Sequence, residues 1–483
     1  MSKEILINIE PQEKRVAITN QGRLEEFYIE RPQDKTIVGN IYKGKIDAIL
    51  PSLGAAFVDI GLPQKGQRGF LYLSELEFAF EAADMPKNLN PTQIKKGQEI
   101  LVQVVKESFG RKGPRLSTHI GLAGRYLVLL PEDNRIGVSR RIEEETERIR
   151  LREILTELKL PKDVGFIVRT AASGKSKQEL MRDVNFLLKL WRRLKKLIVH
   201  KKAPYLIYEE YDLVFRVIRD SFTDDVIRLY VDSKEEYYRI IRFMKTFMGY
   251  LIDRVYLYEG SDLFMEKNVE RQINRIFETK IYLKSKAYIV IEPTEGLVVI
   301  DVNSGGFKKK LDQEEMAFRV NCEAAEEIAR QLILRDLGGI IVIDFIDMEK
   351  EAHRREVLNI LKRSLRNDRA KYDILGISRF GLVEMTRERI HRTADVLSYQ
   401  PCPYCSGRGK VKSALTMAIY VFRELRRLLK TQPQKEVTVS LNPVVIDEVL
   451  KDKESLRLLE NRFKAKINLV SNPSLHIEDF KVS

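Results

Sequence analysis

The sequence predicts a multidomain protein of mixed α/β and α+β class, and three observations lead to this prediction. With 483 residues the chain is too long for a single hydrophobic core, so three or more domains are expected. Short strands separated by glycines come early in the chain, whereas apolar strands alternate with amphipathic helices further on. The hydrophobic fraction is 44%, as in ordinary globular proteins, and no repeat or low-complexity stretch indicates a disordered scaffold.

The first half of the chain contains three kinds of pattern. Residues 1–30 alternate between apolar and polar side chains around polar turns, which predicts a short antiparallel meander. Residues 39–118 have short glycine-punctuated strands, typical of a small closed barrel, with an insert near residues 78–91. Two helices around a short strand are expected within residues 120–210, and further strands and an amphipathic helix within residues 211–275.

The second half begins with an expected α/β unit at residues 277–398. Its elements are, in order, strands at 287–292 and 296–301 that form a hairpin, a helix at 313–335, a buried strand at 339–345 and a helix at 354–365. A short cysteine segment follows at residues 401–409, and a small α+β tail completes the chain.

Charge and composition narrow the classes of function. The 84 Lys and Arg residues against 70 Asp and Glu residues give a net charge of +14, which suits a polyanionic partner but also a soluble protein that is merely basic. No stretch approaches the roughly 20 apolar residues of a membrane span, and the N-terminus lacks a signal peptide. Three cysteines, an odd number, argue against a disulfide framework. We therefore expect a cytoplasmic protein without a membrane span.

Two aspartates are the first candidates for chemistry. Asp301 and Asp344 each end an apolar strand, where a carboxylate needs compensation for its desolvation. Two such carboxylates brought together repel each other, and a divalent cation removes that repulsion. The plain alternative for each aspartate is a cap on the turn or helix that follows. Two strand-end aspartates, one followed by an Asn-Ser-Gly-Gly turn, favour a magnesium site.

The predicted barrel carries candidates for nucleic-acid binding. Phe57 and Phe70 lie on its expected strands, and Lys43 and Lys112 add positive charge. Barrels of the OB type bind single strands by stacking bases on aromatic side chains along a basic groove. A phenylalanine on a strand is more often part of the core, so both interpretations stay open here.

The cysteine segment contains a CxxC turn formed by Cys402 and Cys405 and followed by two glycines. A structural zinc site of the knuckle type and a redox site of the thioredoxin type both use such a turn, and no βαβ pattern surrounds it. Structural zinc takes four ligands, and a second chain could supply the other two. Cys322 lies on an apolar helix and is expected to be core.

The loop after the expected strand at residues 165–170 contains Gly-Lys-Ser but lacks the first glycine of a nucleotide-binding P-loop. Arg169 and Thr170 at its start can still hold a terminal phosphate. The five histidines form no metal-binding pattern, and no nucleophilic triad is evident.

Four sequence motifs together resemble the ribonuclease E/G family, and the resemblance covers essentially the whole chain. The motifs lie at residues 300–305, 338–348, 377–387 and 402–409, and they include Ile-Asp-Val-Asn-Ser-Gly and Ile-Asp-Phe-Ile-Asp-Met. The compact length resembles that of the shorter of the two namesake enzymes of the family.

The resemblance implies a domain layout. It consists of an RNase H-like subdomain in two parts (1–38 and 211–276), an OB-type RNA-binding domain (39–119), a 5′-sensor region (120–210), a DNase I-like catalytic subdomain (277–398), a zinc link (399–410) and a small C-terminal domain (411–483).

The resemblance also implies roles for individual residues. Asp301 and Asp344 hold a catalytic Mg²⁺, and Asn303 lies close to the scissile phosphate. The implied 5′-phosphate sensor consists of Arg169 and Thr170, supported by Gly124 and Val128. The implied RNA contacts are Phe57, Phe70 and Lys112, to which the barrel pattern adds Lys43. Cys402 and Cys405 are expected to bind a structural Zn²⁺ shared between two chains.

The implied activity is that of a magnesium-dependent endoribonuclease. Such an enzyme cleaves single-stranded RNA to products with a 5′-phosphate and a 3′-hydroxyl, is stimulated by a 5′-monophosphate, and acts in rRNA and tRNA processing and mRNA decay. The expected assembly is a homodimer or a tetramer. The rival hypotheses are a non-catalytic, ribosome-associated RNA-binding factor, in which the aspartates are structural, and a nuclease for DNA.

Overall fold

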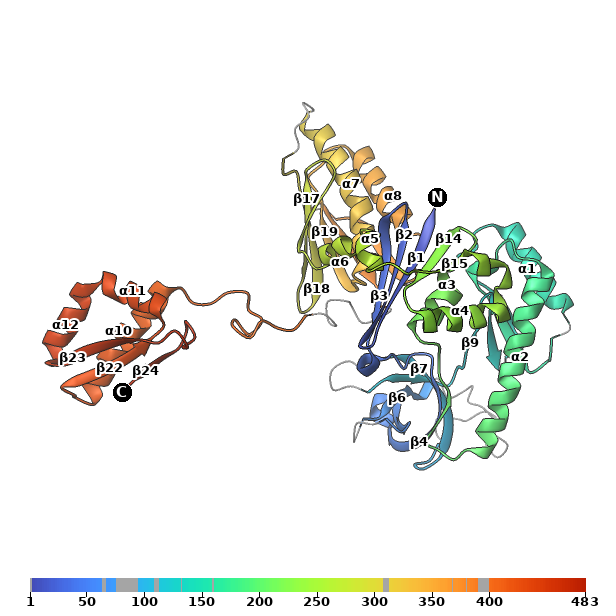
Figure 1. The fold of residues 1–483 in the computed structure, drawn as a ribbon, viewed down its shortest axis with the longest axis horizontal. Coiled ribbons are helices and arrows are strands. Elements are labelled where there is room, and N and C mark those ends of the chain that lie inside the picture. Colours follow the sequence, from blue (N-terminus) through green and yellow to red (C-terminus); the bar gives the residue numbers. More distant parts are fainter. Residues whose placement is uncertain are drawn as a thin grey trace. The chain divides into compact units, whose positions relative to one another are not determined.

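The computed structural model describes residues 2–62, 67–74, 94–107, 113–131, 133–158, 160–306, 312–366, 368–378, 380–389 and 399–483. The chain forms two compact units, Met1–Ala394 and Asp395–Ser483 (Figure 1). The insert expected near residues 78–91 and the candidate Lys112 lie outside the described residues.

The expected N-terminal meander is present and is part of a larger sheet. Strands β1 (Lys3–Glu10), β2 (Glu13–Asn20) and β3 (Arg23–Glu30) are antiparallel neighbours. Strand β14 (Val226–Val231) pairs in parallel with β1, and β15 (Val255–Leu257) continues the sheet. Residues distant in the sequence therefore share one sheet, which packs against helices α3 (Leu213–Ser221) and α4 (Lys234–Phe247).

The expected barrel closes through five strands. They run in the order β4 (Ile41–Leu50), β5 (Ala55–Asp59), β6 (Gly69–Tyr72), β8 (Arg115–Ser117) and β7 (Glu99–Lys106), and β7 pairs back with β4. Gly44 on β4 shows why this barrel needs glycine, because a Cβ there would lie 2.6 Å from Cγ1 of Val58. Strand β13 (Tyr205–Tyr208) joins the outer side of β4.

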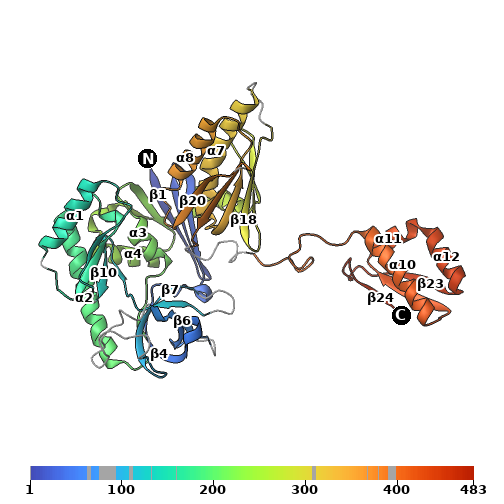
Figure 2. The same ribbon diagram turned by 180° about the vertical axis from the view of Figure 1, so that it is seen from behind.

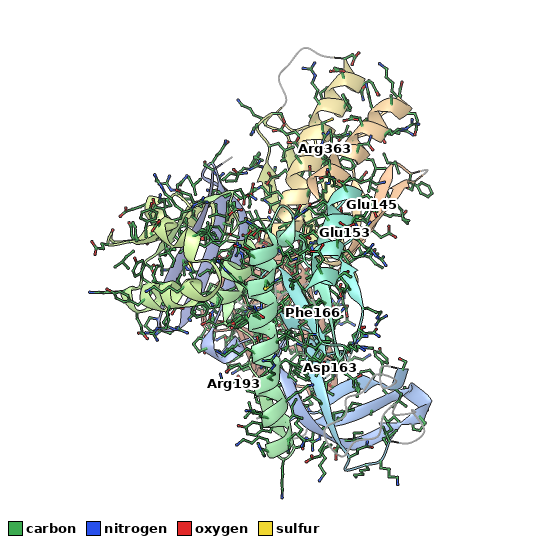
Figure 3. All side chains as sticks on the ribbon, turned by 90° about the vertical axis from the view of Figure 1, so that its right-hand side faces the viewer. Glu145, Glu153, Asp163, Phe166, Arg193 and Arg363 are labelled. Atoms are coloured by element: carbon green, nitrogen blue, oxygen red, sulfur yellow. The ribbon has the colours of Figure 1, made fainter. Side chains whose placement is uncertain are left out.

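Residues 122–200, which follow the barrel in the sequence, form a sheet with two helices. Strands β11 (Ile136–Val138), β12 (Val164–Val168), β10 (Leu127–Pro131) and β9 (Leu122–Ala123) form a sheet in that order. Helices α1 (Glu145–Glu157) and α2 (Lys177–His200) share its hydrophobic core. Figure 3 shows Arg193 of α2 and Glu153 of α1, which are exposed, while Phe166 of β12 is fully buried.

The expected α/β unit is a six-stranded sheet with helices on one face. Its strand order is β16 (Lys280–Tyr282), β17 (Tyr288–Pro293), β18 (Leu297–Asn303), β19 (Gly339–Asp344), β21 (Leu382–Arg387) and β20 (Tyr372–Ile377). Strands β17 and β18 form the predicted hairpin, and α7 (Gln313–Leu334) connects β18 to the parallel strand β19. Helices α7 and α8 (Glu351–Ser364) pack together on the same side of the sheet (Figure 1). Short helices α5 (Leu263–Glu266) and α6 (Glu270–Ile276) precede it.

The C-terminal unit is a small α+β domain, as expected. Strand β22 (Glu436–Leu441) pairs in parallel with β23 (Lys466–Ser471) and antiparallel with β24 (Phe480–Val482). Helices α10 (Ala414–Thr431), α11 (Pro443–Lys451) and α12 (Lys453–Phe463) pack on this sheet (Figure 2).

Most of the predicted helices and strands are present, and their ends differ by only a few residues. Helix α8 begins at Glu351, earlier than predicted, because its first turn has few apolar residues to reveal it. The RNase H-like and DNase I-like assignments and the domain boundaries stay predictions. Within the described residues, no helix is both long and apolar enough to cross a membrane.

Candidate functional site

The two candidate aspartates are direct neighbours in the sheet. Strands β18 and β19 are parallel, and their register pairs Asp301 with Asp344. Both aspartates are exposed, whereas the preceding residues Ile300 and Ile343 are fully buried on the helix-covered face. The pair therefore lies on the open face, at the carboxyl ends of the parallel strands, where α/β sheets place ligands.

Asn303 belongs to the same group. It follows Asp301 by two residues on β18, so its side chain shares the open face, and its Nδ2 donates a hydrogen bond to Oδ2 of Asp301 over 2.6 Å. The turn after it needs glycine at Gly305, where φ is +51° and a Cβ would lie 2.8 Å from the carbonyl oxygen of Lys286.

A third carboxylate, Asp347, lies close enough to affect Asp344. Burial raises the pKa of Asp344, and the negative charges of Asp301 and Asp347 raise it further. The spacing Asp-Phe-Ile-Asp was visible in the sequence, but the role of its second aspartate was not, because Asp347 lies beyond the end of β19.

The aspartate pair suits a cation that needs few protein ligands. No group of three or more His, Cys, Asp and Glu side chains fit to hold a metal occurs in the described residues. Mg²⁺ commonly takes one or two carboxylates and completes its shell with water and phosphate oxygens, and a pair of repelling carboxylates favours it.

The predicted phosphate-sensor residues are brought together around Arg169. Its Nη1 donates to the carbonyl oxygen of Gly124 over 2.7 Å, and its Nη2 forms an ion pair with Oδ1 of Asp220 over 2.7 Å. Gly124 has no room for a side chain, because a Cβ would lie 2.6 Å from Oδ2 of Asp183. Asp183 is buried and accepts the backbone N–H groups of residues 125–127, which fixes this turn.

Thr170 and Val128 flank the arginine. The hydroxyl of Thr170 lies 3.3 Å from that of Ser139 and is therefore held at the start of the loop. Val128 is half-buried on β10, between Ala123 on one side and Ile167 on the other.

A second arginine, Arg369, reaches the surroundings of Arg169 from the α/β unit. The guanidinium of Arg141 donates to the carbonyl oxygen of Arg369 over 2.7 Å, and Arg369 itself donates to the hydroxyl of Ser221 over 2.5 Å. Burial alone would raise the pKa of the Asp220 carboxyl, but the charges of Arg219, Arg169 and Arg369 outweigh it and hold that pKa well below its ordinary value. Several guanidinium groups therefore surround one half-buried carboxylate.

The barrel presents its predicted phenylalanines as a pair. Phe57 and Phe70 are cross-strand partners on β5 and β6, both half-buried, with ring centroids 5.8 Å apart in an edge-to-face arrangement. Phe70 in turn contacts Tyr72 with centroids 4.9 Å apart, and Arg115 lies 4.8 Å over the ring of Tyr72. This aromatic surface with an adjacent arginine is suited to stacking bases.

Lys43 does not fit the predicted role in RNA binding. Its side chain is 9% exposed, and its Nζ donates to the carbonyl oxygens of Ile198 (3.1 Å) and Lys201 (2.9 Å). It also forms an ion pair with Glu99 over 2.8 Å. Lys43 thus links the barrel to the end of α2, and its burial contradicts a direct RNA contact.

The CxxC turn directs backbone hydrogen bonds toward its two sulfur atoms. The backbone N–H of Gly409 donates to Sγ of Cys405 over 3.3 Å, and hydrogen bonds from the backbone of Cys405 and Tyr404 lower the pKa of the Cys402 thiol. The turn precedes α10 and belongs to the C-terminal unit, where the carbonyl oxygen of Tyr404 lies 2.6 Å from Nε2 of His476. Cys322, by contrast, is half-buried on α7, where burial and then the nearby charge of Glu356 raise its pKa to about 11, as suits a core residue.

A paired carboxylate site, a cluster of arginines around Asp220 and an aromatic barrel surface together suit an enzyme that acts on nucleic acid. The model of the Ribonuclease E/G family matches residues 121–390. The model of the S1 RNA binding domain matches residues 35–119, which supports the predicted OB-type barrel, and the RNase E/G thioredoxin-like domain matches residues 401–483.

Curated relatives agree with these matches. The chain is 40% identical to ribonuclease G of Salmonella typhimurium over 95% of its own length and 94% of the relative's. The same identity and coverage hold for ribonuclease G of Escherichia coli K12. The chain is also 41% identical to ribonuclease E of Escherichia coli K12, but it covers 42% of that protein.

The chain therefore belongs to the ribonuclease E/G family, and it is an endoribonuclease. The chain covers 94% of ribonuclease G of Escherichia coli K12 but 42% of ribonuclease E, which agrees with the expected resemblance to the shorter enzyme of the family.

Proposed function

We propose that the chain hydrolyses phosphodiester bonds of single-stranded RNA at a Mg²⁺ site formed by Asp301 and Asp344. The direct pairing of these aspartates across β18 and β19 is the observation that carries the proposal. The expected products have a 5′-phosphate and a 3′-hydroxyl. When bound, Mg²⁺ lowers the pKa of a coordinated water and stabilises charge on the phosphate oxygens.

The protein residues provide binding and orientation. The Asn303 amide holds one oxygen of Asp301, which leaves the carboxylate in a fixed orientation toward the open face. In that position Asn303 can also contact the scissile phosphate, as its place in the family motif implies.

We propose that the arginine cluster around Arg169 recognises a 5′-monophosphate and thereby stimulates cleavage. Arg169 is held in place by the Gly124 carbonyl and Asp220, and Arg369 adds charge from another subdomain. A phosphate with two negative charges can compete for these guanidinium groups through bidentate hydrogen bonds.

The barrel is proposed to bind the RNA strand through Phe57 and Phe70. Their half-buried rings lie on a surface that Tyr72 and Arg115 extend. Lys112, the remaining candidate for this role, is proposed from the family motif alone.

Cys402 and Cys405 are proposed to bind one structural Zn²⁺ together with the same pair of a second chain. Each described chain offers two thiols in one turn, and a closed zinc site takes four ligands. Sharing the ion implies a two-fold homodimer, which can associate further into a tetramer.

The proposed biological role is the maturation of rRNA and tRNA and the decay of mRNA in the cytoplasm. The named relatives are ribonucleases, and the S1 match supports RNA as the partner.

One incubation tests the proposed function against both rivals. Fluorescent single-stranded RNA with a 5′-monophosphate and the DNA of the same sequence are each incubated with Mg²⁺ or with EDTA. Cleavage of RNA alone, and only with Mg²⁺, supports the proposal. Binding of RNA without cleavage would instead identify a non-catalytic RNA-binding factor, and equal cleavage of the DNA would identify a general nuclease.

A further inference from the structure

The open face of the catalytic sheet carries a second row of side chains beside the aspartates. The register of the sheet pairs Tyr282 on β16 with Tyr288 on β17, and Tyr288 with Asn303 on β18. Two residues further along each strand, Lys280 pairs with Val290, and Val290 pairs with Asp301. Directly paired residues point to the same face, so this group shares the open face with the aspartate pair.

Lys280, Tyr282 and Tyr288 form what we call the tyrosine patch. The two ring centroids are 5.9 Å apart, and Nζ of Lys280 lies 3.6 Å from the centroid of Tyr288 and 5.1 Å from that of Tyr282. Tyr282 is 68% exposed, although it is a large aromatic residue. Aromatic rings with an adjacent cation are the combination that binds the bases and phosphates of single strands.

The charge around the tyrosine patch is also suited to a polyanion. Lys284 and Lys286 are exposed in the loop between β16 and β17. Within the described part of the chain, neither they nor Lys280 form a salt bridge with a carboxylate. Lys284 and Lys286 thus add two ammonium groups, in the loop between the two tyrosines, to that of Lys280 within the patch.

We propose that the tyrosine patch is a subsite for a nucleobase that adjoins the cleaved phosphodiester, with Lys280 at a neighbouring phosphate. This inference rests on the proposed function, because it takes the aspartate pair as the place of cleavage. Tyr288 lies one strand from Asn303 and Tyr282 two strands, which corresponds to about 5 Å and about 10 Å. An RNA strand that crosses the aspartates therefore meets the patch within one or two nucleotides.

The two tyrosines have different roles in this subsite. A Cβ on Gly305 would lie 3.0 Å from Cδ1 of Tyr288, so the turn after Asn303 packs directly on that ring. The N–H of Gly306 also donates to the carbonyl oxygen of Lys286 over 3.2 Å. Tyr288 therefore supports the turn, whereas Tyr282 offers the free ring surface and is the residue to test.

The test measures binding in the Asp301→Asn protein, so that cleavage does not interfere. Fluorescence anisotropy with a single-stranded oligoribonucleotide that has a 5′-hydroxyl keeps the phosphate sensor out of the measurement. Adding Tyr282→Ala should raise Kd about tenfold, the effect of one lost stack. Adding Tyr282→Phe should leave Kd unchanged. Tyr256→Ala is the matched control, because Tyr256 is also an exposed strand tyrosine beside another tyrosine, in a different sheet.

A set of oligonucleotides with one abasic nucleotide each then locates the base. One abasic position should weaken binding as much as Tyr282→Ala does, and it should cause no further loss in the Tyr282→Ala protein. Fully additive losses, or equal losses with Tyr256→Ala, would overturn the proposal. A change in oligomeric state caused by Tyr282→Ala in sedimentation would show instead that this face contacts a second copy.

The same experiment separates the two proposals. If the wild-type chain binds RNA with this abasic pattern but does not cleave it, the subsite stands and the proposed cleavage fails. If it cleaves RNA and the abasic pattern is absent, the cleavage stands and the subsite is refuted.

Discussion

Neutralising Asp344 should abolish cleavage and at the same time stabilise the metal-free protein. Asp301 and Asp344 are cross-strand partners, so their carboxylates lie about one strand spacing apart, roughly 5 Å. At that distance two negative charges repel by about 0.8 kcal/mol in water and about 3 kcal/mol at an effective dielectric constant of about 20. Both groups are exposed, so solvent and salt reduce the effect to about 1 kcal/mol or less.

The direction of the pKa shift supports the sign of this effect. The pKa of Asp344 is raised above its ordinary value of 3.8 by burial, Asp301 and Asp347, so its charged form is disfavoured in the folded chain. A carboxyl of this kind favours the fold while it is protonated and loses that contribution as the pH rises through its raised pKa. The advantage of Asp344→Asn should therefore be present at neutral pH and vanish in acid, below the ordinary aspartate pKa.

Thermal unfolding of the wild type, Asp344→Asn and the control Glu292→Gln measures the effect. Glu292 lies on β17, is exposed, and has no carboxylate as a cross-strand partner. In EDTA we expect Asp344→Asn to melt about 1–2 °C above the wild type. Mg²⁺ at ten times its Kd should stabilise the wild type by about 1.4 kcal/mol and leave the variant unchanged. Single-turnover cleavage by the variant, or equal stabilisation of both proteins by Mg²⁺, would refute the metal-site assignment.

The remaining predictions concern the three other groups of candidate residues. Arg169→Ala should erase the preference for 5′-monophosphate over 5′-hydroxyl RNA and leave activity on 5′-hydroxyl RNA nearly unchanged; equal slowing of both substrates would show that it is not a sensor. Phe57→Ala and Phe70→Ala should each weaken RNA binding by about 1–3 kcal/mol per lost stack, whereas a large drop in melting temperature would mean that the rings are core. Elemental analysis should find about half a zinc per chain, and Cys402→Ala with Cys405→Ala should dissociate the dimer in sedimentation. One full zinc per chain, or a double variant that stays dimeric, would contradict the shared site.

The strand-end aspartates could be predicted because their sequence context is local. An apolar run that ends in Asp identifies the strand, its end and the cost of burial. Their direct pairing could not be predicted, because it depends on the register between β18 and β19, which α7 separates in the sequence. The tyrosine patch could not be predicted either, because its members lie in different strands and come together only through the register of β16 with β17.

The burial of Lys43 could not be predicted from its local sequence. A lysine on a barrel strand is usually exposed, and nothing near it in the sequence indicates burial. The partners that bury it, Glu99 and the carbonyl oxygens at the end of α2, come from far along the chain. Asp220 escaped prediction for the same reason, because the charges that surround it come from several segments.

A buried ion pair connects the proposed phosphate sensor to the sheet that carries Asp301 and Asp344. Arg387, 2% exposed at the end of β21, donates from Nε to Oδ2 of Asp368 over 2.6 Å and from Nη2 to Oδ1 over 3.0 Å. Asp368 immediately precedes Arg369, so this pair fixes the backbone from which Arg369 reaches the sensor. Removing one partner of such a pair leaves a buried charge and costs about 3–5 kcal/mol.

The position of this ion pair limits how a 5′-phosphate can act on cleavage. Arg387 pairs with Gly339 at the start of β19, whereas Leu382 pairs with Asp344 at its end. Five residue steps of a strand separate the two ends, which corresponds to about 17 Å. If a 5′-phosphate is held beside Arg369 and cleavage takes place at the aspartates, as we propose, the two phosphates do not touch within one chain. Within one chain its influence must come from holding the substrate strand or from the rigid sheet that connects the two sites. RNA too short to span this distance should gain no stimulation from its 5′-phosphate within one chain.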